Sequence, residues 1–253
     1  MNLIRALARK GLRVFSLEDA FETLKEQGLS ESYAKKVLIL IARKGDLQVL
    51  GNGLYGLPTD ILSGGPLHPF EIAMKIVKKG AISHRSAMFF HDMTDQMLRT
   101  VYVTVPRVEE ANLSTKSTYT IQKTLFQVKR VNSEKFFGVK RFFVGDAPVW
   151  ITDVEKTLLD GLSDPSLCGG FREVLHAFSK SVDAMNPQTL HSYAQKSPIV
   201  VSKRLGWVLE KLTLFSDLQQ KLEESPIKTL QKLNPTGPRK GHANRRWMVM
   251  ENI

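Results

Sequence analysis

The chain has 253 residues, of which 42% are hydrophobic and 24% charged, and its formal net charge is +11. This composition excludes a mainly disordered chain, and the length suits one large domain or two small ones. No run of about 18 apolar residues occurs, and Arg5 and Arg9 interrupt the apolar start, so we expect neither a membrane span nor a signal peptide. The single cysteine, Cys168, excludes a disulfide framework within the chain, and we expect a cytoplasmic protein.

The positive charge is unevenly distributed along the chain. Residues 1–58 have nine basic and six acidic groups, residues 116–141 have seven and one, and residues 221–253 have seven and three. Residues 59–115 are balanced, and residues 142–220 are slightly acidic. Such an excess of positive charge favours an anionic partner, most often nucleic acid. A basic surface without a specific ligand would have the same excess.

Residues 1–58 begin with three stretches of helical periodicity. Their apolar positions start at Leu3, Leu17 and Ala34, and each stretch is followed by a glycine. Ser16, with Asp19 three residues later, and Ser30 are the expected N-caps of the second and third helices. The turn between these two helices is only about three residues long and contains Gly28, which is typical of a helix-turn-helix.

After Gly45 the pattern changes from helix to strand. Two short apolar runs, 47–50 and 54–57, flank Gly51-Asn52-Gly53, and Asn-Gly between such runs predicts a hairpin. Three helices followed by a hairpin predict a winged helix-turn-helix domain over residues 1–58, which would bind DNA.

The third helix has one face suited to the major groove of DNA. Its basic side chains can reach phosphates or guanine edges, and an exposed isoleucine can meet a thymine methyl group. A solvated helix face and a protein-docking module are the alternatives. The candidate DNA-binding residues are Ser32, Lys35, Lys36, Ile39 and Arg43 on this helix, and Asn52 at a wing tip that has no Lys or Arg.

Residues 59–68 read as a linker, and residues 69–253 as a larger domain that mixes helices and strands, which makes the chain α+β. Thr152, with Glu155 three residues later, is the expected cap of a central helix. Helices are expected from Pro69 and Ser83, after Thr152, and near 170–180, 187–195, 202–212 and 214–223; β-prone runs are 101–105, 119–121, 125–128, 136–137, 141–144, 149–151 and 246–250.

Five segments, in order along nearly the whole chain, resemble the AbiEi family of antitoxins from type IV (abortive infection) toxin–antitoxin systems. They are Gly53-Leu54-Tyr55-Gly56-Leu57-Pro58, Gly80-Ala81-Ile82-Ser83 with Ser86-Ala87, Ile151-Thr152-Asp153-Val154-Glu155-Lys156-Thr157-Leu158-Leu159-Asp160 with Gly169-Gly170, Arg204-Leu205-Gly206-Trp207-Val208-Leu209, and Gly241-His242-Ala243-Asn244-Arg245-Arg246-Trp247. The wing departs from the family, whose members usually have a basic residue near its tip.

The resemblance implies two activities in phage defence. The N-terminal domain would bind inverted repeats in the promoter of its own operon and repress transcription, as a monomer or weak dimer that binds cooperatively. The C-terminal antitoxin domain would counter a nucleotidyltransferase-like toxin, possibly without a stable complex. The alternative is an antitoxin that mainly binds or modifies the toxin directly and uses the winged helix for docking.

A central basic block has seven cationic residues and one acid, and on alternating strands these charges would line one open sheet face. That face could be a second DNA contact, an RNA groove, a toxin-related surface or a solvated surface. The block comprises Lys116, Lys123, Lys129, Arg130, Lys135, Lys140 and Arg141, and Arg239, Lys240, Arg245 and Arg246 of the tail could extend it.

Enzyme sites are poorly supported. Asp153, Glu155 and Lys156 have the wrong spacing for a metal-dependent nuclease. His84 and His91 lack a third metal ligand, and no phosphate-binding glycine loop occurs. We therefore expect no catalytic residue, no metal and no cofactor, with a nuclease or a kinase that acts on the toxin as the enzymatic alternative. Trp150, Trp207 and Trp247 are expected in the core.

Overall fold

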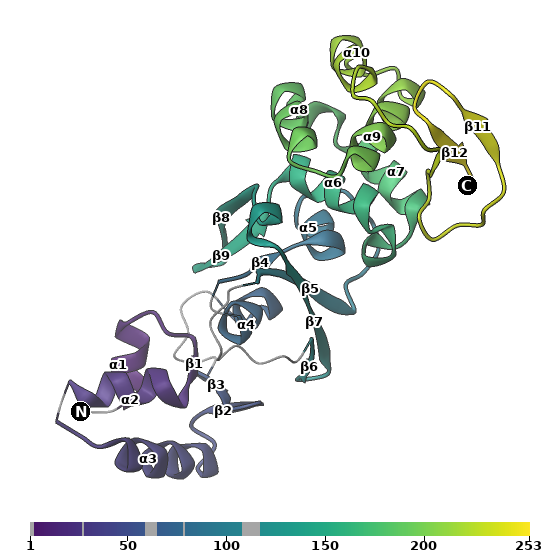
Figure 1. Ribbon diagram of the computed structural model, residues 1–253. Coiled ribbons are helices and arrows are strands. Elements are labelled where there is room, and N and C mark those ends of the chain that lie inside the picture. The colour runs from purple at the N-terminus through teal and green to yellow at the C-terminus, as the bar shows by residue number, and fades with distance from the viewer. Residues whose placement is uncertain (1–2, 27, 59–64, 78, 108–116) are drawn as a thin grey trace.

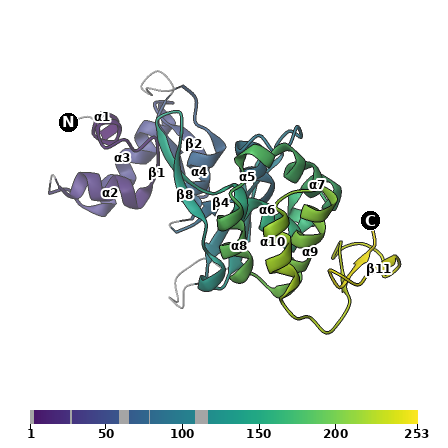
Figure 2. The same cartoon turned by 90° about the horizontal axis from the view of Figure 1, so that it is seen from above.

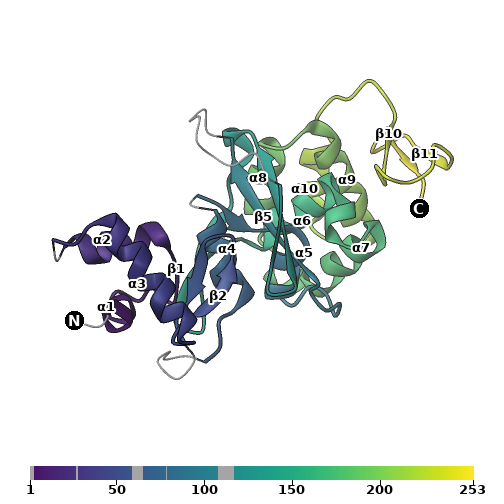
Figure 3. The same ribbon diagram turned by 90° about the horizontal axis from the view of Figure 1, so that it is seen from below.

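A computed structural model describes residues 3–26, 28–58, 65–77, 79–107 and 117–253 (Figure 1). The described chain mixes helices with three sheets, which confirms the predicted mixture of α and β structure. Its buried apolar residues form three clusters. The N-terminal helices lie at one end of the molecule and α6 to α10 at the other, with the largest sheet between them (Figures 2 and 3).

The N-terminal unit has its own core of residues between Leu3 and Leu57. Its short strands form an antiparallel sheet in the order β1-β3-β2. Ser16 caps α2 with the expected capping box to Asp19, and Ser30 caps α3. The elements are α1 (Leu3–Arg9), β1 (Val14–Ser16), α2 (Leu17–Lys25), α3 (Glu31–Arg43), β2 (Gln48–Gly51) and β3 (Leu54–Gly56).

The middle of the molecule is a mixed six-stranded sheet in the order β6-β7-β5-β4-β9-β8. Neighbouring strands alternate between antiparallel and parallel pairing across this order. The strands are β4 (Ala81–Ile82), β5 (Thr100–Pro106), β6 (Thr118–Ile121), β7 (Thr124–Val131), β8 (Val139–Val144) and β9 (Ala147–Thr152). The run 136–137 belongs to none of them, because a short 3-10 helix, η1 (Ser133–Lys135), precedes it and a turn through Gly138 follows.

Helix α5 (His84–Phe90) follows the two-residue strand β4, which lies between β5 and β9. The Tyr102 amide of β5 donates a 2.9 Å hydrogen bond to the Ser86 hydroxyl, and His91 Nε2 lies 2.7 Å from the Thr152 carbonyl oxygen of β9. These side chains supply the partners that a longer β4 would otherwise give to its neighbours.

Helix α4 (Pro69–Ile76) connects the N-terminal unit to the six-stranded sheet. Phe70 of α4 shares a buried cluster with Val14 and Leu54 of the N-terminal unit and with sheet residues such as Val103. Beside this contact, Arg13 Nε lies 3.0 Å from a carboxylate oxygen of Glu71, and both side chains are at most one-tenth exposed. The two units therefore share buried apolar and ionic contacts.

The helices after β9 form a layer with its own core, centred on residues such as Leu162, Phe178 and Leu205. The first of them is capped by Asp153 and not by Thr152 as predicted, because the Asp153 carboxylate accepts from the Lys156 amide at 3.0 Å. The helices are α6 (Val154–Ser163), α7 (Phe171–Lys180), α8 (Pro187–Gln195), α9 (Ile199–Lys211) and α10 (Ser216–Glu223), with short 3-10 helices η2 (Pro165–Cys168) and η3 (Val182–Ala184).

The last segment folds back onto α9 as a small sheet in the order β10-β12-β11. Trp247 is fully buried there, and its ring occupies the place that a Cβ at Gly206 would need, since that atom would lie 2.0 Å from Cζ3. Trp207 is also buried, but Trp150 is 49% exposed, so the prediction of three core tryptophans is wrong for Trp150. The strands are β10 (Gln231–Lys232), β11 (His242–Asn244) and β12 (Val249–Glu251).

Each helix that the structure describes is too short, or too polar, to cross a membrane.

Candidate nucleic-acid interface and basic cavity

The outer face of α3 is open to solvent along its whole length. The Ser30 hydroxyl accepts a 3.3 Å hydrogen bond from the Tyr33 amide at the start of the helix. Ala34 and Leu38 hold the inner face in the N-terminal core. The five candidate DNA-binding residues of this helix are all exposed: Ser32, Lys35, Lys36, Ile39 and Arg43.

Three exposed apolar residues of the N-terminal unit were missed by the sequence analysis. Tyr33 and Leu40 of α3 are 48% and 57% exposed, and Val49 of β2 is 61% exposed. For Leu40 the signal was present in the five consecutive apolar residues 37–41, because one face of a helix cannot bury all of them. The surface of this unit is thus both basic and apolar.

The β2–β3 turn has the predicted backbone, with φ of 52° at Asn52 and 74° at Gly53. The Asn52 side-chain amide donates to the Thr120 carbonyl oxygen of β6 at 3.4 Å. This bond places the tip of the hairpin beside the large sheet, so the Asn52 amide already has a protein partner in the absence of DNA.

The central basic block does not line one sheet face, and this expectation is wrong. Strand order places β5, β4 and β9 between β7, which contains Lys129 and Arg130, and β8, which contains Lys140 and Arg141. Alternation along β7 also directs Lys129 and Arg130 to opposite faces. Lys123 is exposed in the β6–β7 turn, Lys135 is exposed in η1, and Lys116 lies outside the described residues.

Several of these cations have partners within the protein. Lys140 Nζ lies 3.3 Å from the Asp153 carboxylate, and Arg141 stacks 5.2 Å from the centre of the Phe143 ring. In the tail, Arg245 and Arg246 are both exposed, and Arg246 forms ion pairs with Glu210 of α9 and Glu223 of α10. The tail therefore lies against α9 and α10, whereas the strands of the block belong to the six-stranded sheet.

The structure instead gathers part of the block around a cavity of about 240 Å³ between the end of β7, α6 and the start of α9. We call it the basic cavity. Two carboxylates, Asp160 and Asp164, also line it. Its cationic lining residues are Arg107, Lys129, Arg130, Lys135, Lys156 and Lys196.

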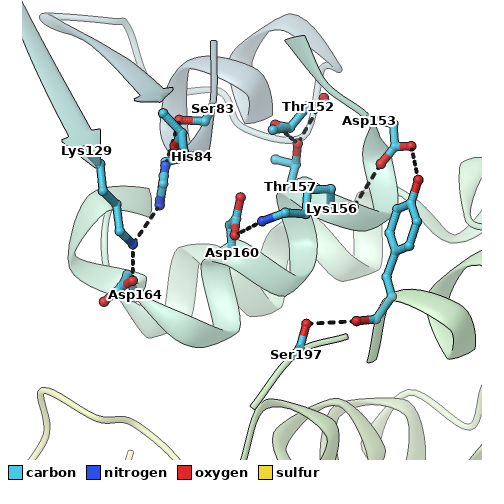
Figure 4. A network of polar contacts seen from close by, with 12 residues as sticks. Ser83, His84, Lys129, Thr152, Asp153, Lys156, Thr157, Asp160, Asp164 and Ser197 are labelled. Carbon is cyan, nitrogen blue, oxygen red and sulfur yellow. Dashed lines mark hydrogen bonds and ion pairs between the residues drawn. The ribbon is translucent and has the colours of Figure 1, made fainter. Parts of the chain in front are cut away.

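A polar network forms one wall of this cavity (Figure 4). Lys129 Nζ forms an ion pair with Asp164 and lies 3.3 Å from Nε2 of His84. One helical turn away along α6, Lys156 forms an ion pair with Asp160. Lys129 reaches Asp164, just after α6, from β7, whereas Lys156 belongs to α6 itself, so acidic and basic side chains meet along this wall.

The histidine of this network is completely buried. His84 Nδ1 lies 2.8 Å from the Ser83 hydroxyl, which in turn lies 2.8 Å from the Thr104 hydroxyl. Burial lowers the pKa of His84 to about 4, with Lys129 as a smaller cause in the same direction, so the imidazole is neutral near pH 7. It therefore acts as a hydrogen-bonding group of the interior.

The residues considered for enzyme chemistry have local structural partners. The Asp153 carboxylate accepts from the Tyr193 hydroxyl at 3.0 Å, and Glu155 accepts from the Asn186 amide at 2.8 Å. Burial raises the pKa of the Cys168 thiol. Over the described ranges, no three His, Cys, Asp or Glu side chains are grouped as metal ligands.

No family model matches this chain, and no curated protein matches it. Its fold is similar to that of the RV2827C protein from Mycobacterium tuberculosis, known from a crystal structure. The two share 12% sequence identity at a TM-score of 0.66, over 98% of this chain and 89% of that one. At this identity the likeness concerns the fold alone.

Proposed function

We propose that this protein is a sequence-specific DNA-binding repressor of its own operon and the antitoxin of a type IV toxin–antitoxin system. Residues 3–58 act as a winged helix-turn-helix, with α3 in the major groove of promoter DNA and the β2–β3 hairpin as the wing. The larger domain counters a nucleotidyltransferase-like toxin, as the resemblance to the AbiEi family implies.

One observation carries the DNA-binding half of the proposal. The exposed face of α3 combines the cations Lys35, Lys36 and Arg43 with the small polar Ser32 and the apolar Ile39. Cations bind phosphates and guanine edges, and an apolar side chain binds thymine methyl groups, so this mixture suits base readout better than a purely charged face does.

Substitution on this face tests the DNA-binding half. Lys36→Ala and Arg43→Ala should each weaken binding to a promoter inverted repeat by about 1–3 kcal/mol if either residue reads a guanine. Fluorescence anisotropy at fixed salt measures this, because phosphate contacts depend on ionic strength. Lys221→Ala on α10 is the matched control, since it removes one exposed lysine far from α3. Unchanged affinity in both α3 variants would exclude α3 as the recognition helix.

The antitoxin half is tested in the intact chain. Deletion of the N-terminal unit would remove Arg13 from Glu71, and Val14 and Leu54 from the cluster they share with Phe70, so a truncated protein can fail for structural reasons. The double variant Lys36→Ala, Arg43→Ala avoids this. It should lose repression of a promoter reporter and still protect cells that express the toxin; loss of protection together with repression would contradict this division of labour.

A second candidate function is direct docking of the toxin on the N-terminal unit. Exposed Leu40 and Val49 favour it, because large apolar side chains on a surface often mark protein interfaces. In that case a neighbouring nucleotidyltransferase would co-purify with the protein, and Leu40→Ser would reduce the complex while operator affinity stayed unchanged.

A further inference from the structure

We propose that the basic cavity binds a small ligand that carries a polyphosphate group. This is a binding site apart from α3, and it holds whether or not the protein represses its own promoter. Four observations support it: the charge of the lining, the convergence of separate elements, the helix end that opens on the cavity, and an aromatic wall.

The charge of the lining is strongly positive. Arg130 belongs to the lining, but its side chain leaves the other face of β7, so five cationic side chains face two carboxylates and the formal charge is +3. Asp164 and Asp160 pair with Lys129 and Lys156, so the positive excess of the cavity comes from Arg107, Lys135 and Lys196. Like charges collected in one concave site repel one another and raise the local concentration of anions.

The cations come from segments far apart in the sequence. Lys129 extends from β7, Lys156 from α6, and Lys196 from the turn between α8 and α9. Gly138 permits this convergence: its φ is 67°, and a Cβ there would lie 2.7 Å from Cβ of Lys156. A side chain at position 138 would therefore push the preceding loop, which contains Phe137, away from α6.

The N-terminus of α9 opens on the cavity. This helix has 13 residues, its N-cap is Pro198, and no side chain accepts from its first turn. Ser197, Pro198 and Val201 line the cavity, so the helix start lies at the same place as the cations. The Ser197 and Val201 amides already donate to the Ala194 and Pro198 carbonyl oxygens, so this helix start contributes the positive end of its dipole, which attracts phosphate groups.

An aromatic wall orients two of the lysines. Lys156 Nζ and Lys196 Nζ lie 4.9 Å and 5.6 Å from the centre of the Phe137 ring, and Tyr193 packs edge-on against that ring at 5.0 Å. Cation–π contacts hold both ammonium groups near the ring without neutralising them, so Lys196 is available to an anion, whereas Lys156 also pairs with Asp160. Lys196 is exposed at the mouth and Lys156 is buried at the wall.

The chemistry of the lining selects the ligand class. The cationic lining would repel a metal ion, and a neutral molecule would gain nothing from these charges. A polyphosphate has several anionic oxygens, which can accept from cationic side chains on different segments at the positive end of the α9 dipole. Both nucleoside triphosphates and inorganic triphosphate have this group, and binding experiments separate the two sources.

Titration calorimetry on the full chain at about 0.15 M ionic strength tests the proposal, with inorganic triphosphate and ATP as the probes. One site should bind triphosphate. Lys196→Ala should weaken binding about tenfold, because one charge-assisted hydrogen bond is lost. Lys228→Ala, an exposed lysine outside the cavity, should leave it unchanged. Tighter binding of ATP than of triphosphate assigns a nucleotide, and equal affinities assign the polyphosphate group itself.

A second variant introduces a competing anion without removing any cation. Ser197→Asp places a carboxylate beside the start of α9, where a negative charge interacts favourably with the helix dipole, and it gives up the 2.8 Å hydrogen bond that the Ser197 hydroxyl donates to the Tyr193 carbonyl oxygen. This variant should stay folded by circular dichroism and lose at least about tenfold in triphosphate affinity. Absence of triphosphate and ATP binding, or equal binding by wild type, Lys196→Ala and Ser197→Asp, would overturn the proposal; so would equal weakening by Lys228→Ala, which would indicate non-specific attraction.

Discussion

Replacing His84 tests whether a neutral buried imidazole makes the fold sensitive to acid. Burial lowers the pKa of His84 from 6.5 to about 4, and the charged groups around it are Lys129 on β7, Lys156 and Asp160 on α6, and Asp164 just after α6. Between these two pKa values the unfolded chain binds a proton that the folded chain does not. The free energy of unfolding must therefore fall as the pH falls from about 6.5 to 4.

The size of this effect follows from the two pKa values. One pKa unit corresponds to about 1.4 kcal/mol, so the full shift is worth about 3 kcal/mol, and about 2.5 kcal/mol of it is lost between about pH 7.5 and pH 4.5. His84→Asn removes the titration. Asparagine tolerates the positive φ of 51° at this position, and its amide can still reach the Ser83 hydroxyl.

Urea unfolding followed by circular dichroism, at several pH values in that range, gives the free energy of unfolding of both proteins. Carboxylates that titrate in the same range are common to the two, so the difference between the proteins isolates position 84. Between about pH 7.5 and pH 4.5, the free energy of unfolding of the wild type should fall by about 2.5 kcal/mol more than that of His84→Asn. Parallel pH profiles would show that His84 has the same pKa in the folded and in the unfolded chain.

Three further predictions concern stability, each measured by urea unfolding. Gly206→Ala should lower the free energy of unfolding by at least about 1 kcal/mol, because the added Cβ meets the buried Trp247 ring, and a gain in stability would mean that the ring moves freely. Trp150→Ser should change stability by less than about 1 kcal/mol, since Trp150 is half exposed, while Trp247→Ala should cost about 3–5 kcal/mol; similar losses would contradict their different burial. Arg13→Met should cost about 3 kcal/mol by leaving Glu71 buried and unpaired, and a neutral result would show that water reaches Glu71.

Local sequence patterns predicted most helices because the signals for a helix lie within the helix and its cap. Helix α8 begins and ends at Pro187 and Gln195 as expected, and Ser16 and Ser30 cap the predicted helices. The strands β1 and β4 were missed, because two or three residues have no measurable periodicity and are held by partners distant in the sequence, such as Gly56 for Val14.

The candidate sites depended on information that the sequence does not contain. The face of α3 could be predicted, since the spacing of Ser32, Lys36, Ile39 and Arg43 fixes it once the helix is known. The basic block could not, because strand order separates β7 from β8. The basic cavity joins Lys129 to Lys196 across 67 positions of chain, and no local pattern marks such a meeting.

The burial of Trp247 against Gly206 also sets an order for folding during synthesis. The core of the N-terminal unit uses residues between Leu3 and Leu57 and becomes complete early, as the ribosome continues along the chain. The core of α6 to α10 includes Trp247 and Val249, so it stays open until those residues have emerged. The surface of α3 is thus formed while the helical layer is still unfinished, so a nascent chain exposes α3 before the core of α6 to α10 has closed.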